Sequence, residues 1–180
     1  MRRIVYYVAS SLDGFISGLN DDISGFVASG NGVDKYLSDL ANFDTVIMGR
    51  STYEFGYKYG VQPGQPAYPH MEHYIFSNNL ELENPNPKVQ VKKLDINEVE
   101  DLQKQEGTDI YLCGGGQFAG WLLDHQKIDL LKLKINPLIL GEGIKMFGKS
   151  VKKYELQLID SANYENGLQI MTYQIHYNKA

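Results

Sequence analysis

Three glycines separate a strand pattern from a helix pattern in the stretch Ile110-Tyr111-Leu112-Cys113-Gly114-Gly115-Gly116-Gln117-Phe118. The apolar residues before the glycines favour a strand, and the residues behind them repeat apolar side chains at a helical spacing through Trp121 and Leu122. Glycine lets a backbone approach a ligand closely, and the start of a helix offers free N–H groups to an anion. The stretch therefore predicts a strand, a glycine turn and a helix that bind a phosphate. The alternative is that the glycines only form a tight turn.

The composition indicates one domain over residues 1–180. With 43% hydrophobic residues, a chain of 180 residues can bury a substantial core. The net charge is −5 and no block of like charges occurs, which argues against binding to nucleic acid or to an anionic membrane surface. No window approaches the roughly 18 apolar residues of a membrane span, and the N-terminal apolar run is too short for a signal peptide. We therefore expect a cytoplasmic protein.

Neither the cysteine nor the histidines predict a reactive site or a metal site. Cys113 is the only cysteine, which excludes an internal disulfide, and it ends a strand that we expect to be buried. His70 and His73 lie in a proline-rich loop, and the other two histidines are isolated. Because isolated histidines are seldom ligands, we expect no metal ion.

Short apolar runs alternate with amphipathic stretches, as in α/β domains. Leu131, Leu133 and Ile135 alternate with polar residues through Asn136, which predicts a half-buried strand that ends at Pro137. Two further alternating segments meet at Asn166-Gly167 and predict a terminal antiparallel hairpin. We expect a mostly parallel sheet of about eight strands with four flanking helices. The other strands expected in this sheet include residues 3–9, 45–48, 73–76 and 110–113.

The segment from Ser17 to Gly32 is long, polar and dotted with glycines, and it follows a core strand. A segment of this length without regular structure is commonly disordered or a functional lid, and we favour the lid. A helical pattern follows, in which Val33, Tyr36, Leu37, Leu40 and Ala41 share one face. Asp34 then falls in the first turn of the helix, where an acid complements the helix dipole.

Polar residues follow three of the predicted strands at the points where these strands end. They are Gly49-Arg50-Ser51-Thr52, Ser77-Asn78 and the glycine triplet. Ligands of open α/β sheets gather at the carboxyl ends of the strands, so one extended dinucleotide could contact all three segments. Guanidinium, hydroxyl and backbone N–H groups suit its phosphates. The alternative is that the polar residues cap short helices.

Two other phosphate-binding motifs fit the chain less well. Gly114-x-Gly116-x-x-Ala119 satisfies a loose dinucleotide fingerprint, but the acid normally found about 20 residues later is replaced by Asn136. Residues 143–150 fit the letters of a nucleotide-triphosphate P-loop. A P-loop is followed by a helix, whereas the residues after Ser150 alternate like a strand. We therefore reject the P-loop.

Several motifs, taken in order along nearly the whole chain, resemble the dihydrofolate reductase superfamily. The last of them is most similar to the C-terminal reductase domain of the riboflavin biosynthesis protein RibD and to stand-alone bacterial proteins of the same kind. These motifs are Leu12-Asp13-Gly14-Phe15-Ile16-Ser17, Val46-Ile47-Met48-Gly49-Arg50-Ser51-Thr52-Tyr53-Glu54, the glycine triplet and Pro137-Leu138-Ile139-Leu140-Gly141-Glu142-Gly143. The resemblance implies a dihydrofolate reductase-like three-layer fold with NADPH lying across the carboxyl edge of the sheet.

The resemblance also assigns roles to residues. It implies that Gly49, Arg50, Ser51 and Thr52, helped by Ser77, hold the adenosine half of NADPH with its extra phosphate. Gly114 and Gly115 correspond to the cis glycine pair of the family beside the pyrophosphate, with Gly116, Gln117 and Phe118 next to them. Ala9 and Ile16 flank the nicotinamide. Asp34 is the nearest match to the catalytic carboxylate of dihydrofolate reductases, whereas Asp13 belongs to the riboflavin-type segment and could shape its loop.

The implied activity is hydride transfer from NADPH to a small pterin, pyrimidine or similar heterocycle, as in 5-amino-6-(5-phosphoribosylamino)uracil reductases and dihydrofolate reductases. Two departures leave the substrate open: the predicted lid has no tryptophan, and residues 33–43 replace the arginine- and histidine-containing segment of riboflavin-pathway reductases. The alternative function is a catalytically inactive NADPH-binding or nucleotide-binding module. Relatives of this kind are commonly dimers, so we expect a homodimer.

Overall fold

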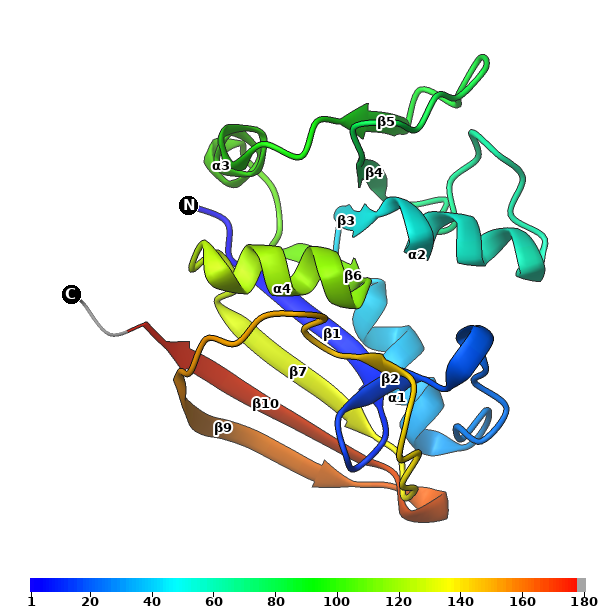
Figure 1. Ribbon diagram of the computed structural model, residues 1–180, viewed down its shortest axis with the longest axis vertical. Coiled ribbons are helices and arrows are strands. Elements are labelled where there is room, and N and C mark those ends of the chain that lie inside the picture. Colours follow the sequence, from blue (N-terminus) through cyan, green and yellow to red (C-terminus); the bar gives the residue numbers. More distant parts are fainter. Residues whose placement is uncertain (178–180) are drawn as a thin grey trace.

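The computed structural model describes residues 1–177 and contains an eight-stranded sheet in the order β5-β4-β3-β6-β1-β7-β10-β9 (Figure 1). The six strands from β5 to β7 in this order are parallel, and β10 and β9 add an antiparallel pair at one edge. The predicted sheet and its C-terminal hairpin are therefore confirmed. The strands are β1 (Ile4–Ser10), β3 (Thr45–Gly49), β4 (Glu72–Phe76), β5 (Val89–Lys92), β6 (Ile110–Gly114), β7 (Leu130–Ile135), β9 (Glu155–Asn163) and β10 (Gln169–His176).

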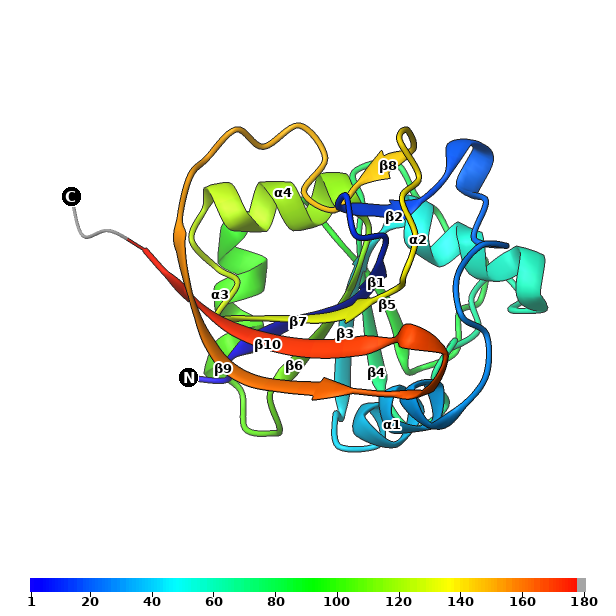
Figure 2. The same cartoon turned by 90° about the horizontal axis from the view of Figure 1, so that it is seen from below.

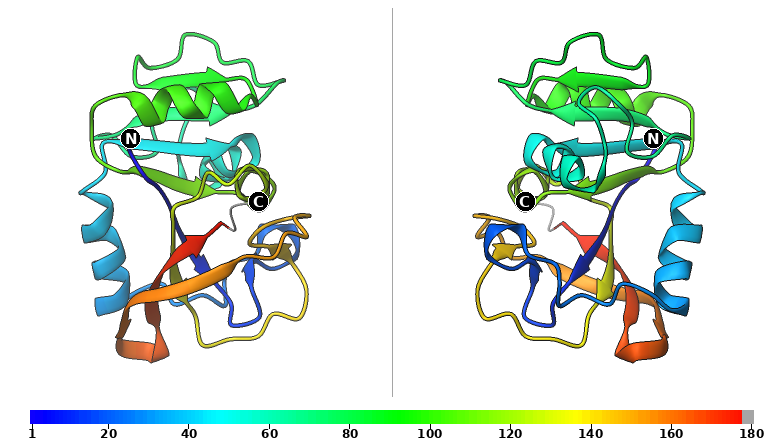
Figure 3. Two further views of the ribbon diagram at one scale, coloured as in Figure 1. Left: turned by 90° about the vertical axis from the view of Figure 1, so that its left-hand side faces the viewer. Right: turned by 90° about the vertical axis from the view of Figure 1, so that its right-hand side faces the viewer.

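Helices cover both faces of this sheet and make three layers (Figure 2). Helix α1 (Asn31–Leu40) lies on one face, and α3 (Ile96–Lys104) and α4 (Gly116–Asp124) lie on the other. The short helix α2 (Arg50–Phe55) begins directly where β3 ends. Figure 3 shows a second, two-stranded sheet on the side opposite α1, formed by β2 (Phe15–Ser17) and β8 (Ile144–Lys145). The three 3-10 turns are η1 (Leu19–Asp21), η2 (Gly56–Tyr59) and η3 (Glu165–Gly167).

Each face of the sheet has its own apolar core. On the α3 and α4 side, Leu102 and Leu122 pack with Tyr6 of β1. On the α1 and α2 side, Leu40 and Tyr53 pack with Tyr111 of β6 and with other buried residues. Strands covered on both faces carry few polar positions, which explains why the apolar runs of β1, β3 and β6 are nearly continuous.

Strand β7 differs from its predicted half-buried form. Its neighbours are β1 and β10, and α1 covers the face on which Lys132, Lys134 and Asn136 lie. Lys134 is only 8% exposed and Asn136 is fully buried. The prediction that the polar face of this strand is exposed to solvent is therefore wrong, because a helix far away in the sequence covers that face. The inward face predicted for α1 also needs a correction, since Leu37 is 58% exposed.

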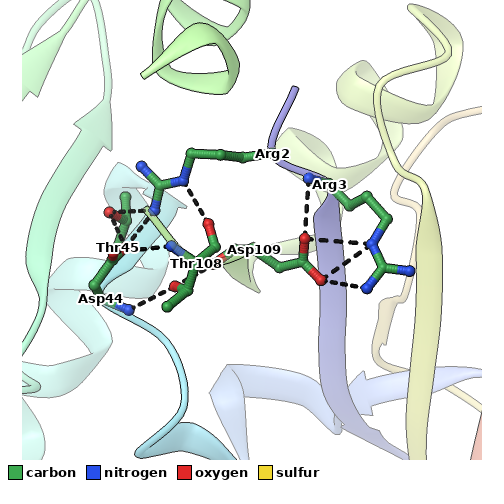
Figure 4. Close-up of polar contacts among 6 residues, drawn as sticks. All are labelled: Arg2, Arg3, Asp44, Thr45, Thr108 and Asp109. Atoms are coloured by element: carbon green, nitrogen blue, oxygen red, sulfur yellow. Dashed lines mark hydrogen bonds and ion pairs between the residues drawn. The ribbon is translucent and has the colours of Figure 1, made fainter. Parts of the chain in front are cut away.

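A clasp of polar side chains joins the amino ends of β1, β3 and β6 (Figure 4). The buried Arg2 guanidinium pairs with Asp44 and donates to the Thr45 hydroxyl at 2.8 Å. The backbone N–H of Thr108 donates to the Asp44 carboxylate at 3.0 Å. Arg3 adds an exposed ion pair to Asp109 at 2.6 Å. The clasp fixes the end of the sheet opposite to the carboxyl ends of the same strands.

The turn of the terminal hairpin uses the Asn-Gly pair as predicted. Asn166 has φ 60° and Gly167 has φ 74°, the left-handed values that a tight hairpin turn of this class requires. None of the helices within residues 1–177 has the length and apolar character to cross a membrane.

Candidate functional site

A cleft of about 1140 Å³ lies at the carboxyl ends of β1, β3 and β6. Its walls come from the segment between β2 and α1, from α1 and α2, and from the beginning of α4. Parallel strands present their carboxyl ends at one edge, so segments far apart in the sequence meet here. The residues predicted for cofactor binding that line this cleft are Ala9, Ile16, Gly49, Arg50, Ser51, Thr52, Gly115, Gly116, Gln117 and Phe118.

The start of α2 and the glycine triplet are in direct contact inside this cleft. A β-carbon built on Gly115 would lie 2.8 Å from Thr52 Oγ1, and one built on Gly49 would lie 3.1 Å from Phe118 Cβ. The peptide bond between Gly114 and Gly115 is cis. Thr52 therefore packs directly on the Gly115 backbone, and any side chain at Gly115 would push the two segments apart.

The third glycine of the triplet has a packing role that the sequence did not indicate. A β-carbon on Gly116 would lie 2.1 Å from the carbonyl oxygen of Lys145. Gly120, one turn later in α4, would meet the carbonyl of Phe147 at 2.2 Å. Both glycines let the 143–150 segment lie flat against α4. This segment is the one that matches the P-loop letters, and β9 rather than a helix follows it.

Arg50 presents a cation at the mouth of the cleft. Its side chain is 45% exposed, and its Nε donates to Glu54 Oε1 at 2.8 Å, one turn along α2. Ser51 is exposed beside it. An exposed pair of this kind contributes little to stability, so the guanidinium is free to bind an anion.

Tyr36, Tyr68 and Cys113 line the part of the cleft near α1, and the buried Tyr111 lies behind them. The hydroxyls of Tyr36 and Tyr111 share a hydrogen bond of 2.7 Å, and Tyr68 Oη lies 3.6 Å from Cys113 Sγ. Burial raises the pKa of Tyr36, of Tyr68 and of Cys113. These groups are therefore neutral hydrogen-bonding partners around neutral pH. Cys113 is half-buried against the cleft rather than enclosed in the core.

The family model of the RibD C-terminal domain matches residues 2–170, which is nearly the whole chain. The protein belongs to the RibD C-terminal domain family. One relative is the uncharacterized protein YwjB of Bacillus subtilis (strain 168), which is 28% identical over 189 residues covering 99% of each chain.

Solved structures show the same fold. A Shewanella sp. PV-4 protein named for riboflavin biosynthesis has a TM-score of 0.80 at 23% identity and covers 98% of this chain and 100% of its own. Dihydrofolate reductase from Enterococcus faecalis, complexed with NADP(H), has a TM-score of 0.68 at 16% identity over 97% of each chain. The dihydrofolate reductase-like fold is therefore confirmed for this RibD C-terminal domain.

Three predicted site residues of this RibD-type domain do not line the cleft. Asp34 is exposed on α1, whereas Val33 and Tyr36 of the same helix face the cleft. Ser77 Oγ accepts hydrogen bonds from the backbone N–H groups of Asn79 and Leu80 and so shapes a turn. Gly114 is buried at the end of β6, behind Gly115. The placement of Asp34 gives no support to its expected role as the acid.

The predicted lid segment forms one wall of the cleft. Phe26, Val27 and Ala28 line it, and the buried Asn136 side chain holds this wall in place by accepting the Val27 N–H at 2.8 Å. Asp13 shapes a neighbouring loop, because its carboxylate accepts the backbone N–H groups of Leu140 and Gly141 at 3.1 and 2.8 Å. The Ser11 hydroxyl together with these groups lowers the pKa of Asp13 to about 2. Asp13 is therefore ionised and structural.

Lys134 is a charged cleft residue that the sequence did not predict. Its Nζ lies 4.6 Å from the centre of the Tyr36 ring, and burial lowers its pKa. Lys132, Lys134 and Asn136 alternate with apolar residues, and this alternation was interpreted as the solvent-exposed face of a half-buried strand. An ammonium group, several phenols and a thiol thus surround the inner cleft of this RibD-type domain, while the arginine and hydroxyls lie at its mouth.

Proposed function

We propose that this protein is an NADPH-dependent reductase that transfers a hydride to a small nitrogen heterocycle of the pterin or pyrimidine type. The observation that carries the proposal is the contact between the Arg50-Ser51-Thr52 segment and the glycine triplet within one cleft. An extended phosphorylated cofactor needs a cation, hydroxyls and open backbone in one groove. Membership of the RibD C-terminal domain family supports this reading, and so does the NADP(H) complex of the structurally similar dihydrofolate reductase.

The cleft residues fit both halves of the cofactor. Arg50, Ser51 and Thr52 would hold the adenosine half with its extra phosphate, Gly115 and Gly116 would lie against the pyrophosphate, and Ala9 and Ile16 would flank the nicotinamide. When bound, NADPH supplies the hydride. The residues of this chain orient the two rings, exclude water and supply a proton. Phe76, Phe118 and Trp121 stack in a row along the cleft, with ring centres 4.9 and 5.9 Å apart, and exclude water there.

Arg50→Ala is expected to narrow the preference for NADPH over NADH. A charge-assisted hydrogen bond is worth roughly 1.5–3 kcal/mol, so NADPH should bind roughly 10- to 100-fold more weakly while NADH changes little. Titration of the cofactors, followed through the fluorescence of Trp121 in the cleft, measures both affinities. Equal losses for NADPH and NADH would mean that Arg50 does not contact the extra phosphate.

A matched control comes from the partner of Arg50. Glu54→Ala removes the ion pair at 2.8 Å but leaves the guanidinium. NADPH binding should stay the same or become tighter in this variant, because the arginine no longer shares its charge. A loss as large as that of Arg50→Ala would point to a general disturbance of α2.

The second candidate is a nucleotide-binding module without catalysis. The placement of Asp34 outside the cleft favours it, because the expected acid is then missing. Following NADPH oxidation with dihydrofolate, flavin precursors and quinoid pterins separates the two. Turnover of any of them supports the reductase, and tight NADPH binding without turnover of any supports the binding module.

We also propose that the protein is a homodimer that pairs through β9. This edge strand exposes Leu156, Leu158 and Ile159, which are each 47–49% exposed. Light scattering during size-exclusion chromatography should give twice the chain mass of 20.4 kDa. The Leu158→Glu variant should give the mass of a single chain. A monomer mass for the unmodified chain would contradict this proposal.

A further inference from the structure

The inner cleft contains an ammonium group without a counter-ion. Within residues 1–177, no group forms an ion pair with Lys134 Nζ or accepts a hydrogen bond from it. Lys132, two positions earlier on the same face of β7, makes the contrast clear. Its Nζ binds the Asp39 carboxylate at 2.6 Å. The two lysines lie on the same face of β7, but only Lys132 has a carboxylate that neutralises its charge.

The position of Lys134 faces the space that a substrate would occupy. In the sheet it lies beside Ala9 of β1 and Ile170 of β10, neither of which can pair with a charge. The residue is 8% exposed, and its Nζ lies over the Tyr36 ring at 4.6 Å. A cation can be held over an aromatic face, but the ring does not replace a hydrogen-bond acceptor. The donors of the ammonium group are therefore available to a ligand in the cleft.

No other described group near the inner cleft is a suitable acid. Asp21, the acidic residue of the lining, pairs with Lys58 at the surface. Asp34 is exposed on α1. The phenols of Tyr36 and Tyr68 are weaker acids than usual, because burial raises the pKa of each. Burial has the opposite effect on Lys134, since it lowers the pKa of the ammonium toward the range in which a general acid works well.

We propose that Lys134 is the recognition residue and the acid of the reaction: its ammonium binds the oxygen or nitrogen end of the bond to be reduced and protonates it. The inference rests on the proposed reductase function. NADPH would supply the hydride for the new C–H bond, the π electrons of the C=O or C=N bond would move to the heteroatom, and that atom would take its proton from Lys134 Nζ. Water at the cleft mouth then returns a proton to the neutral amine.

This arrangement selects the class of substrate. A cation in the inner cleft repels a protonated amidine ring, the form that a carboxylate would attract. It attracts a ring with a carbonyl oxygen, an imine nitrogen or an ionised imide edge. The expected substrates are therefore uncharged or anionic carbonyl-bearing heterocycles of pyrimidine or pterin size.

A binding experiment tests the recognition step without turnover. The NADPH-saturated protein is titrated calorimetrically with uracil, which offers carbonyl oxygens, and with 2,4-diaminopyrimidine, which offers amino donors and a protonated ring. We expect uracil to bind more tightly, and Lys134→Met to weaken it roughly tenfold or more. Lys134→Glu should reverse the preference between the two probes. NADPH affinity should stay within twofold in both variants, since Arg50 and Gly115 are unchanged.

A kinetic experiment tests the proton step with any substrate found in the oxidation screen. Lys134→Met should lower kcat by roughly 100-fold or more. Lys134→Arg keeps the charge but holds its proton more firmly, so KM should stay near the original value while kcat falls. Burial holds the pKa of Lys134 below the ordinary lysine value of 10.5. In the unmodified protein, kcat should therefore fall as the pH rises through this lowered pKa, because Lys134 loses its proton. The ionisable group in contact with Lys134 Nζ is Tyr36 from α1. The strand neighbours Ala9 of β1 and Ile170 of β10 carry no charge, and Asp39 balances the charge of Lys132 two positions earlier.

A stability measurement separates this role from a structural one. A buried ammonium without a partner destabilises the fold, so Lys134→Met should raise Tm by a few degrees. A lower Tm together with unchanged uracil binding would overturn the proposal, and so would a kcat in Lys134→Arg equal to that of the unmodified protein. Failure to bind NADPH, or failure to oxidise it with any substrate, counts against the reductase. If NADPH does not bind, the uracil titration is made without it. Loss of the uracil preference in Lys134→Met then still supports the recognition step.

Discussion

Gly116→Ala is expected to lower the free energy of unfolding by about 3 kcal/mol, although alanine is normally the better helix former at such a position. The new β-carbon would lie 2.1 Å from the Lys145 carbonyl oxygen and 3.3 Å from the Gly148 amide nitrogen. Both are backbone atoms, so neither can rotate away. The 143–150 segment is also anchored to β1, because the buried Tyr6 hydroxyl donates to the Met146 carbonyl at 3.0 Å. The clash therefore displaces the segment or α4 itself.

Urea denaturation measures the loss, and Gly60→Ala provides the control. Gly60 has φ 91°, and a β-carbon there meets nothing within 4 Å. Alanine at Gly60 should cost only the strain of the left-handed conformation, about 1 kcal/mol. A loss at Gly116 no larger than at Gly60 would show that the 143–150 segment moves aside freely.

Asn136→Ala is expected to lower the free energy of unfolding by about 2–3 kcal/mol and to weaken NADPH binding. The side chain is fully buried, accepts the Val27 N–H at 2.8 Å and donates to the carbonyls of Ser10 and Lys134 at 3.2 and 3.3 Å. Alanine leaves these groups without their partner, and a buried unsatisfied group costs roughly 1–3 kcal/mol. It also releases the wall of the cleft that contains Phe26 and Val27.

Three measurements follow this effect: urea denaturation, NADPH titration and limited proteolysis of residues 18–30. The control is Asn42→Ala, an exposed asparagine just after α1, which should change the free energy of unfolding by no more than about 0.5 kcal/mol. Unchanged proteolysis of the 18–30 segment in Asn136→Ala would mean that other contacts hold the wall. In that case the predicted loss of NADPH affinity has no physical basis.

Local patterns along the chain predicted much of the fold. The continuous apolar runs at β1, β3 and β6, and the Asn166-Gly167 turn, carry their conformation in their own residues. The chemistry of the strand ends was predictable for a related reason, since parallel strands must bring their carboxyl ends to one edge. The cis bond between Gly114 and Gly115 followed from the resemblance and not from the pattern.

The structure departs from the local patterns where two distant segments meet. Lys134 and Asn136 alternate with leucines exactly as solvent-facing residues do, and only the packing of α1 on β7 shows that they are buried. Asp34 and Tyr36 lie on nearly opposite sides of a helix, and only the packing of α1 in the tertiary structure decides that Tyr36 faces the cleft.

Neighbouring residues are enough to predict the order of strands, turns and helices and the edge of the sheet at which polar groups gather. Which of those groups enclose one space depends on how distant elements pack. The tertiary structure buried Lys134 without a counter-ion, placed Asp34 outside, and made Gly116 a packing residue under the Lys145 carbonyl. The physical reason is that burial and charge pairing depend on contacts between residues far apart in the chain, which no local pattern contains.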